Sequence, residues 1–303
     1  MVAGPGPRRM RRPPPGGDGP SGRDVMVHTS SVSSVPRVDG RVLALILTHD
    51  DPVELQRCVD AVFAQTRRPD AVVVTDNASS PPAAPQAPGA DPGWLSVDHL
   101  TVNGGPAGGH HAGLSRFLDD DRFDLAWVLD DDVVPAPGCL EALVAAAAEG
   151  PAGIRWPLQR HPNATAGQYP GWFGVLIPRS VVERVGTPNL ELFWWTEDTE
   201  YLQWRIPRAG FSSTVVPAAE VEHTGRRAGA RPDWKLYYEA RNTIVYRVRT
   251  QRLEHPMKLA RILTALLIRA VLDGPGRRRR LKLLGTAVAD GARGRLGRRV
   301  GLP

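Results

Sequence analysis

The chain has 303 residues, of which 42% are apolar, a proportion typical of a soluble globular protein. Its net charge of +6 is unevenly spread: residues 1–24 carry +3, residues 257–303 carry +10, and the stretch between them carries −7. An acidic body with basic ends argues against a uniformly basic nucleic-acid-binding domain, and two cysteines without metal-ligand spacing argue against a disulfide scaffold or a structural zinc site.

The first part of the chain is predicted to alternate strands and helices. Residues 1–40 are rich in Pro, Gly, Ser and Arg, and we expect disorder because they hold too little apolar surface to offset the entropy of ordering. Beyond them, short apolar runs predict strands at 42–47, 71–75, 95–102 and 125–129. Helices are expected at 52–63, from a Gly-rich turn at 103–109 to about 118, and at 139–148. Strands joined by helices pair in parallel, which predicts an α/β fold with a mostly parallel central sheet.

The second part of the chain is less regular. Strands are expected at 172–177 and 213–216, and helices at 180–185, 198–209 and 234–248, with Pro207 as a flaw in the second of these helices. We expect residues 41–250 to form one domain. Residues 251–303 are interpreted as a basic amphipathic helical tail that includes a helix at 257–272.

Three consecutive carboxylates, Asp130, Asp131 and Asp132, follow the predicted buried strand at 125–129. Ligands of open α/β sheets bind outside the carboxyl ends of the strands, and buried carboxylates are costly without a counter-cation. The run at 119–121 has the same composition but ends a helix, so we interpret it as solvated surface. The later triplet favours a Mg²⁺ or Mn²⁺ site shared with substrate phosphates over a plain acidic turn.

Two other polar motifs follow predicted strands. Asp76 offers an acceptor for a base imide and Asn77 offers both donors and acceptors, but an Asx turn that caps the strand explains them equally well. The glycines of 103–109 would let the backbone approach a ligand. This motif is weak alone, because neither the dinucleotide-binding glycine pattern nor a P-loop is present in the sequence.

A further acidic pair lies beside tryptophans. Trp194 and Trp195 precede Glu197 and Asp198 at a predicted helix start. Aromatic side chains beside paired carboxylates are typical of a sugar-binding site with a general base, although an acid at a helix start is often only a cap. His223, after another strand, is either structural or the residue that completes a metal site with the aspartates.

In this order, the motifs resemble glycosyltransferase family 2, in particular its bacterial rhamnosyltransferases and galactofuranosyltransferases. The resemblance covers residues 41–250 and implies a GT-A fold. Each anchor is short, but the ordered set is specific. The anchors are Leu47-Thr48-His49-Asp50, Ala64-Gln65-Thr66, Asp76-Asn77-Ala78-Ser79, Asn103-Gly104-Gly105, Leu129-Asp130-Asp131-Asp132, Trp195-Thr196-Glu197-Asp198 and Tyr238-Glu239-Ala240-Arg241-Asn242.

The resemblance implies a role for each candidate residue. The pyrimidine nucleoside would be held by Thr48, Asp76 and Asn77, with Asn103, Gly104 and Gly105 passing near it. The divalent metal, Mn²⁺ or Mg²⁺, would be bound by Asp130, Asp132 and His223, and Asp131 would lie against the donor ribose or sugar. Asp198 would deprotonate the acceptor hydroxyl with Glu197 beside it, and the acceptor surface would include Trp194 and Trp195.

The reaction implied is an inverting transfer of a sugar, rhamnose or galactofuranose, from a UDP- or dTDP-sugar to a glycan or lipid-linked glycan in cell-envelope or polysaccharide synthesis. A metal would neutralise the diphosphate leaving group, and a positioned carboxylate would remove the acceptor proton. A sugar-nucleotide nucleotidyltransferase is the nearest enzymatic alternative, but it would usually show a Gly-rich basic loop after the first strand. A non-catalytic membrane-binding or nucleic-acid-binding module is the other alternative.

The tail carries apolar residues at helical spacing from Leu259 to Val271, followed by the basic run Arg277–Arg280 and by Lys282. Such a helix can lie in an anionic membrane interface, or its apolar stripe can pack on the domain. No apolar run reaches about 18 residues, and no apolar segment follows the N-terminal arginines. We therefore expect a cytoplasmic protein that is peripheral at the inner face of the plasma membrane and binds no nucleic acid.

Overall fold

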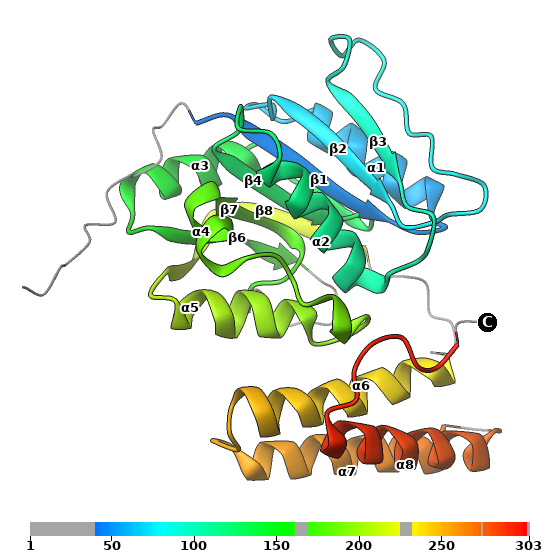
Figure 1. Ribbon diagram of the computed structural model, residues 1–303. Helices are drawn as coiled ribbons and strands as arrows, with labels where there is room; N and C mark the ends of the chain where they lie inside the picture. The colour runs from blue at the N-terminus through cyan, green and yellow to red at the C-terminus, as the bar shows by residue number, and fades with distance from the viewer. Residues whose placement is uncertain (1–39, 161–168, 225–231, 274, 302–303) are drawn as a thin grey trace, which may run out of the picture. The chain divides into compact units, whose positions relative to one another are not determined.

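The computed structural model describes residues 40–160, 169–224, 232–273 and 275–301 (Figure 1). The segment predicted to be disordered, residues 1–40, lies outside the described residues except for Gly40. None of the helices in the described ranges is long and apolar enough to cross a membrane.

One eight-stranded sheet, in the order β3-β2-β1-β4-β7-β6-β8-β5, organises the fold. Its first half is parallel, as the sequence predicts, because β1 pairs in parallel with both β2 and β4, and β2 with β3. The second half is mixed, since β7 runs antiparallel to both β4 and β6. The strands are β1 (Val42–Thr48), β2 (Ala71–Asp76), β3 (Leu95–His99), β4 (Leu125–Asp130), β5 (Val133–Pro135), β6 (Gly153–Arg160), β7 (Phe173–Pro178) and β8 (Ser212–His223).

Helices bury both faces of the sheet. Alternate residues of β1 point to opposite faces: Ala44 and Ile46 join a core with the helices α1 and α3, whereas Leu43 and Leu45 join a core with α2, α4 and α5. This two-sided burial explains why the parallel strands read as continuous apolar runs. The helices are α1 (Pro52–Phe63), α2 (Gly105–Leu118), α3 (Cys139–Glu149), α4 (Arg179–Val185) and α5 (Ile206–Arg208).

One predicted helix boundary is wrong, at the Gly-rich stretch 103–109, whereas the predicted helix at 198–209 is present and only the flaw expected at Pro207 is absent. The Gly-rich stretch at 103–109 is mostly not a turn, because α2 begins at Gly105 with Pro106 in its first turn, where a missing N–H costs nothing. Pro207 does not break the helical run, which passes from a π-helical segment, Thr199–Arg205, directly into α5. Pro207 lies in the first turn of α5, and the run ends only at Ala209.

The tail predicted at 251–303 folds into a small bundle with the preceding helix. The helices α6 (Asp233–Val245), α7 (Pro256–Leu272) and α8 (Arg277–Arg293) lie side by side (Figure 1) and share a core that includes Leu266, Ala270, Leu284 and Ala287. The apolar stripe predicted on α7 is therefore divided. Leu266 and Ala270 are buried, whereas Leu267 and Ile268 are 47% and 53% exposed.

Candidate active site

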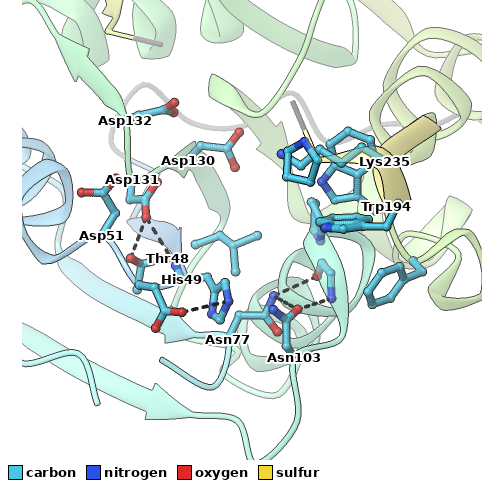
Figure 2. A pocket seen from close by; sticks show the side chains of 17 residues that line it. Thr48, His49, Asp51, Asn77, Asn103, Asp130, Asp131, Asp132, Trp194 and Lys235 are labelled. Atoms are coloured by element: carbon cyan, nitrogen blue, oxygen red, sulfur yellow. Dashed lines mark hydrogen bonds and ion pairs between the residues drawn. The ribbon is translucent and has the colours of Figure 1, made fainter. Parts of the chain in front are cut away.

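A cavity of about 660 Å³ lies at the carboxyl ends of β1, β2 and β4. Figure 2 shows two facing walls, with the carboxylates of Asp130, Asp131 and Asp132 on one side and Trp194 and Lys235 on the other. The sequence-predicted residues that line the cavity are Thr48, Asn77, Asn103, Gly105, Asp130, Asp131, Asp132 and Trp194. Those that do not line it are Asp76, Gly104, Trp195, Glu197, Asp198 and His223.

The ends of β1 and β4 are fastened together through Asp131. The Thr48 hydroxyl donates to Asp131 Oδ2 at 2.6 Å, and the His49 amide reaches the same oxygen at 3.4 Å. Thr48 and Asp131 are only 2% and 7% exposed, so this charge-assisted bond is sheltered from water. Its effect is to fix the middle carboxylate of the triplet at the floor of the cavity.

Two asparagines shape the loop that starts α2. The Asn77 side chain donates to Asn103 Oδ1 and to the Gly105 carbonyl, and it accepts from the Gly104 amide at 2.9 Å. Gly105 has φ +68, and a Cβ there would lie 2.1 Å from the Phe193 carbonyl oxygen. Glycine at this position is therefore required twice, by the backbone conformation and by the close approach of the chain segment before Trp194.

Asp76 is buried beneath the cavity rather than exposed in it. Its carboxylate accepts from the backbone amides of Ser79 and Ala83 and contacts His99 Nδ1 at 2.8 Å. Burial opposes ionisation, but these hydrogen bonds outweigh it and lower the pKa of Asp76 to about 2. The sequence left two roles open for Asp76, forming a turn or contacting the nucleoside. The structure shows the turn-forming role.

The predicted metal ligands are only partly brought together. His223 Nε2 lies 3.1 Å from Asp132 Oδ1, whereas Asp130 Oδ1 contacts His110 Nε2 at 3.1 Å. Burial would lower the pKa of His223, but the bond to Asp132 and the charges of the triplet outweigh it and raise that pKa. In the part of the chain that the structure describes, no group of three or more His, Cys, Asp or Glu side chains is arranged to hold a metal ion.

The wall opposite the triplet is aromatic and carries a cation. Trp194 stacks on Trp195 with ring centroids 5.2 Å apart and meets Trp234 edge-on at 5.4 Å. The Lys235 ammonium lies 4.7 Å from the Trp194 ring centroid, within cation–π range. Trp234 and Lys235 were not predicted as site residues. The sequence signal for them is an aromatic–basic pair at the start of the predicted helix 234–248, directly upstream of the Tyr238–Asn242 motif.

The acidic pair Glu197–Asp198 lies just before the π-helical segment. Asp198 accepts from the Thr199 amide and hydroxyl, while Glu197 Oε2 is buried without a hydrogen-bond partner among the described residues. Burial raises the pKa of both carboxyls, and the charge of Asp130 raises them further. The charge of Asp198 also opposes ionisation of Glu197, whose pKa lies well above its usual range. The pair is therefore close to the acidic triplet and favours holding a proton.

Comparison with known proteins decides the class of enzyme. Residues 44–179 match the family described as Glycosyl transferase family 2. The chain contains a glycosyl transferase family 2 domain. The galactofuranosyltransferase GlfT1 of Mycobacterium tuberculosis is 28% identical over 219 residues, which cover 61% of this chain and 70% of that protein. GlfT2 of the same organism is 33% identical over 78 residues, 25% of this chain and 12% of that protein.

Solved structures agree with the fold of this glycosyltransferase. A mannosyltransferase from Pyrobaculum calidifontis, in complex with GDP-Man and Mn²⁺, aligns with TM-score 0.54 and 18% identity over 84% of this chain and 81% of that chain. GalNAc-T7 with UDP, GalNAc and Mn²⁺ aligns with TM-score 0.50 and 14% identity over 75% and 55% of the two chains. The GT-A fold expected from the motifs is confirmed, and glycosyl transfer replaces the nucleotidyltransferase and non-catalytic alternatives.

Proposed function

We propose that the protein is an inverting, metal-dependent glycosyltransferase that moves galactofuranose or rhamnose from a UDP- or dTDP-sugar to a glycan or lipid-linked glycan. The observation that carries this proposal is the cavity in which three carboxylates at strand ends face an aromatic wall, with Asp198 close by. The similarity to GlfT1 favours galactofuranose. Cell-envelope or polysaccharide synthesis is the setting that such a transfer would serve.

The donor would bind along the strand ends of the first half of the sheet. Thr48, Asn77 and Asn103 line the cavity there and offer hydroxyl and amide groups to a nucleoside. Asp131 lies between them and the rest of the triplet, where the ribose or the transferred sugar would sit. Asp76 supports this wall by fixing the chain after β2, and its direct contact with the base stays a prediction.

The residues present suit a hard divalent cation. Mg²⁺ and Mn²⁺ are commonly bound by one or two carboxylates together with substrate phosphates, so a protein site need not be complete before the donor arrives. Asp132 and His223, already in contact, would hold the metal, with Asp130 as the further carboxylate. Bound there, a cation would neutralise the charge that develops on the diphosphate leaving group.

Asp198 would take the proton of the acceptor hydroxyl. Its raised pKa brings it toward the range in which a carboxylate is an effective base near neutral pH, and Glu197, whose pKa is raised further, would keep the proton that the pair shares. A single displacement at the anomeric carbon then inverts its configuration without a covalent intermediate. The acceptor sugar would pack against Trp194, which lines the cavity and is backed by the stacked ring of Trp195.

The outer face of the bundle would bind an anionic membrane surface at the cytoplasmic side of the plasma membrane. Met257, Ile268 and Leu272 of α7 are 80%, 53% and 72% exposed. The exposed basic residues Arg277–Arg279 follow directly at the start of α8. Arg280 does not belong to this surface, because it is buried and donates to the Ala270 and Pro275 carbonyls. An apolar face beside clustered cations is the arrangement that interfacial helices use.

The proposal is tested by a donor screen and one variant. Thermal shift with UDP-galactofuranose, dTDP-rhamnose and other nucleotide sugars, each with Mn²⁺, should stabilise the protein with its own donor. Asp198→Asn should abolish transfer while leaving donor affinity within about twofold, since it changes the base and not the donor wall. Normal turnover by Asp198→Asn would remove Asp198 from the mechanism, and no shift with any donor would overturn the proposal.

A further inference from the structure

The chain that leads into the acidic pair has an unusual backbone. Phe193, Trp195 and Thr196 all have positive φ, at 62, 72 and 77, although none of them is glycine. Side chains with a Cβ adopt this region at an energetic cost, and the surroundings must hold them in it. The base candidate Asp198 follows two residues after this strained segment, so its position depends on whatever holds the segment.

The segment is held from one side by α6. Asn242 is fully buried, and its Nδ2 lies 2.8 Å from the Leu192 carbonyl, 2.9 Å from that of Trp194 and 2.7 Å from that of Trp195. An amide has two N–H groups, so three acceptors share them. Arg241, also fully buried, donates to the Leu192 carbonyl at 3.1 Å and to Asn242 Oδ1 at 2.8 Å, which fixes the orientation of the amide.

The same segment touches the donor side of the cavity. The Phe193 carbonyl accepts from the Ala107 amide in the first turn of α2, and it lies against Gly105. The strained segment thus bridges the loop that Asn77 shapes and the helix that carries Asn242. A shift of this segment would move Trp194 and Asp198 together, relative to a donor wall that rests on the strands.

We propose that Asn242 is a positioning residue for the base: it holds the carbonyls of Trp194 and Trp195 so that the strained backbone places Asp198 at the acceptor hydroxyl, and Arg241 orients Asn242 for this task. The inference rests on the proposed role of Asp198. A displacement of about 1 Å at a reacting group commonly lowers the rate by about 100-fold, even when the substitution lies away from the chemistry. Asn242 itself is fully buried and does not line the cavity.

The first test separates positioning from folding. Asn242→Ala should lower kcat by about 10- to 100-fold and leave the affinity for the donor with Mn²⁺ unchanged within about twofold. Ile244→Ala is the matched control, because Ile244 is a buried α6 residue whose side chain meets Gly291 of α8 and not the strained segment. It should weaken the bundle while leaving kcat within about threefold. Equal kcat losses in the two variants at equal thermal stability would overturn the proposal.

The second test uses the strain itself. In the Asn242→Ala background, Thr196→Gly removes the Cβ that makes φ +77 costly, whereas Thr196→Ala keeps it. Adding Thr196→Gly should raise kcat at least threefold above that of Asn242→Ala alone, whereas adding Thr196→Ala should leave kcat unchanged. Equal rescue by both, or none by either, would overturn the positioning role. If Asp198→Asn is fully active, the proposed base fails; if Asp198→Asn is inactive and Asn242→Ala has normal kcat, only the present inference fails.

Discussion

Replacement of Asp76 by asparagine tests a buried carboxylate that supports the donor wall and whose pKa is lowered. The carboxylate has two oxygens that each accept a backbone amide, from Ser79 and Ala83, and asparagine can satisfy only one of these as an acceptor. The pKa of Asp76 falls from 3.8 to about 2, and the side chain is almost fully buried. The shift corresponds to about 2.5 kcal/mol of folding stability when the carboxyl is ionised in both states.

The sign of the pH dependence follows from the direction of that shift. A depressed pKa in the folded protein gives stability that is complete above the unfolded pKa and is lost as pH falls toward the folded pKa. From these two pKa values, the contribution of Asp76 is about 2.4 kcal/mol at pH 6, about 2.2 at pH 4 and about 1.3 at pH 3. The stability difference between the wild type and Asp76→Asn should therefore shrink by about 0.2 kcal/mol from pH 6 to pH 4 and by about 1.1 kcal/mol from pH 6 to pH 3.

Urea unfolding of the two proteins at these three pH values measures the difference. Comparing the pair cancels the titration of every other carboxyl, which both proteins share. A difference that stays constant from pH 6 to pH 3 would refute the reasoning, because it would mean that the hydrogen bonds to Asp76 do not distinguish its ionised form. A difference that grows on acidification would reverse the assigned sign.

Three further predictions concern the metal, the loop and the membrane. Asp132→Asn should weaken donor affinity at least tenfold in Mn²⁺ and little in EDTA, measured by calorimetry, and an equal loss in both media would contradict a metal role. Gly105→Ala should destabilise the protein by about 1–2 kcal/mol from its positive φ alone, and more from the collision with the Phe193 carbonyl; a change in unfolding free energy below about 0.5 kcal/mol would contradict that geometry. Ile268→Asp should reduce flotation with anionic vesicles, whereas Val53→Asp, at a site on α1 that is also more than half exposed, should not. Unaltered flotation of Ile268→Asp would count against the membrane surface.

The strands of the parallel half of the sheet could be predicted from the sequence, because burial on both faces makes them continuous apolar runs. Some strands of the mixed half lack this pattern. The segment Gly153–Arg160 contains Arg155 and Pro157, which argue against a central strand, yet the Arg155 guanidinium is buried against the Ala146 and Pro151 carbonyls. The ladder between β6 and β8 tolerates Pro157 by shifting register directly after it. The helix α8 lies within the predicted helical tail but was given no bounds of its own, since Arg277–Arg280 and two glycines mask the buried pair Leu284 and Ala287.

The candidate site was predictable where chemistry shows in the residue type. Carboxylates that follow a buried strand indicate a bound cation or a charged substrate, whatever the conformation of the neighbouring loops. The structure places Asp130, Asp131 and Asp132 at the cavity. The contacts of Asn242 could not be predicted, because they depend on three carbonyls almost 50 residues earlier in the chain. His110 was likewise not predicted as a site residue: it contacts Asp130, and its ring stacks on Trp172 with the ring centroids 4.2 Å apart.

The helix α6 contacts both the strained segment before Asp198 and the helices α7 and α8. One side fastens the segment before Asp198, and another packs on α7 and α8, whose outer face carries the exposed apolar side chains. Local opening of α6 would release both the segment before Asp198 and the packing of α7 and α8. The order of that segment and the packing of the bundle therefore depend on the same free energy of opening. By linkage, any surface that binds α7 and α8 only in their folded form lowers the population of the opened state and with it the fraction of molecules whose catalytic segment is loose. If the bundle binds a membrane as proposed, residues 233–293 would couple that binding to the order of the acidic pair.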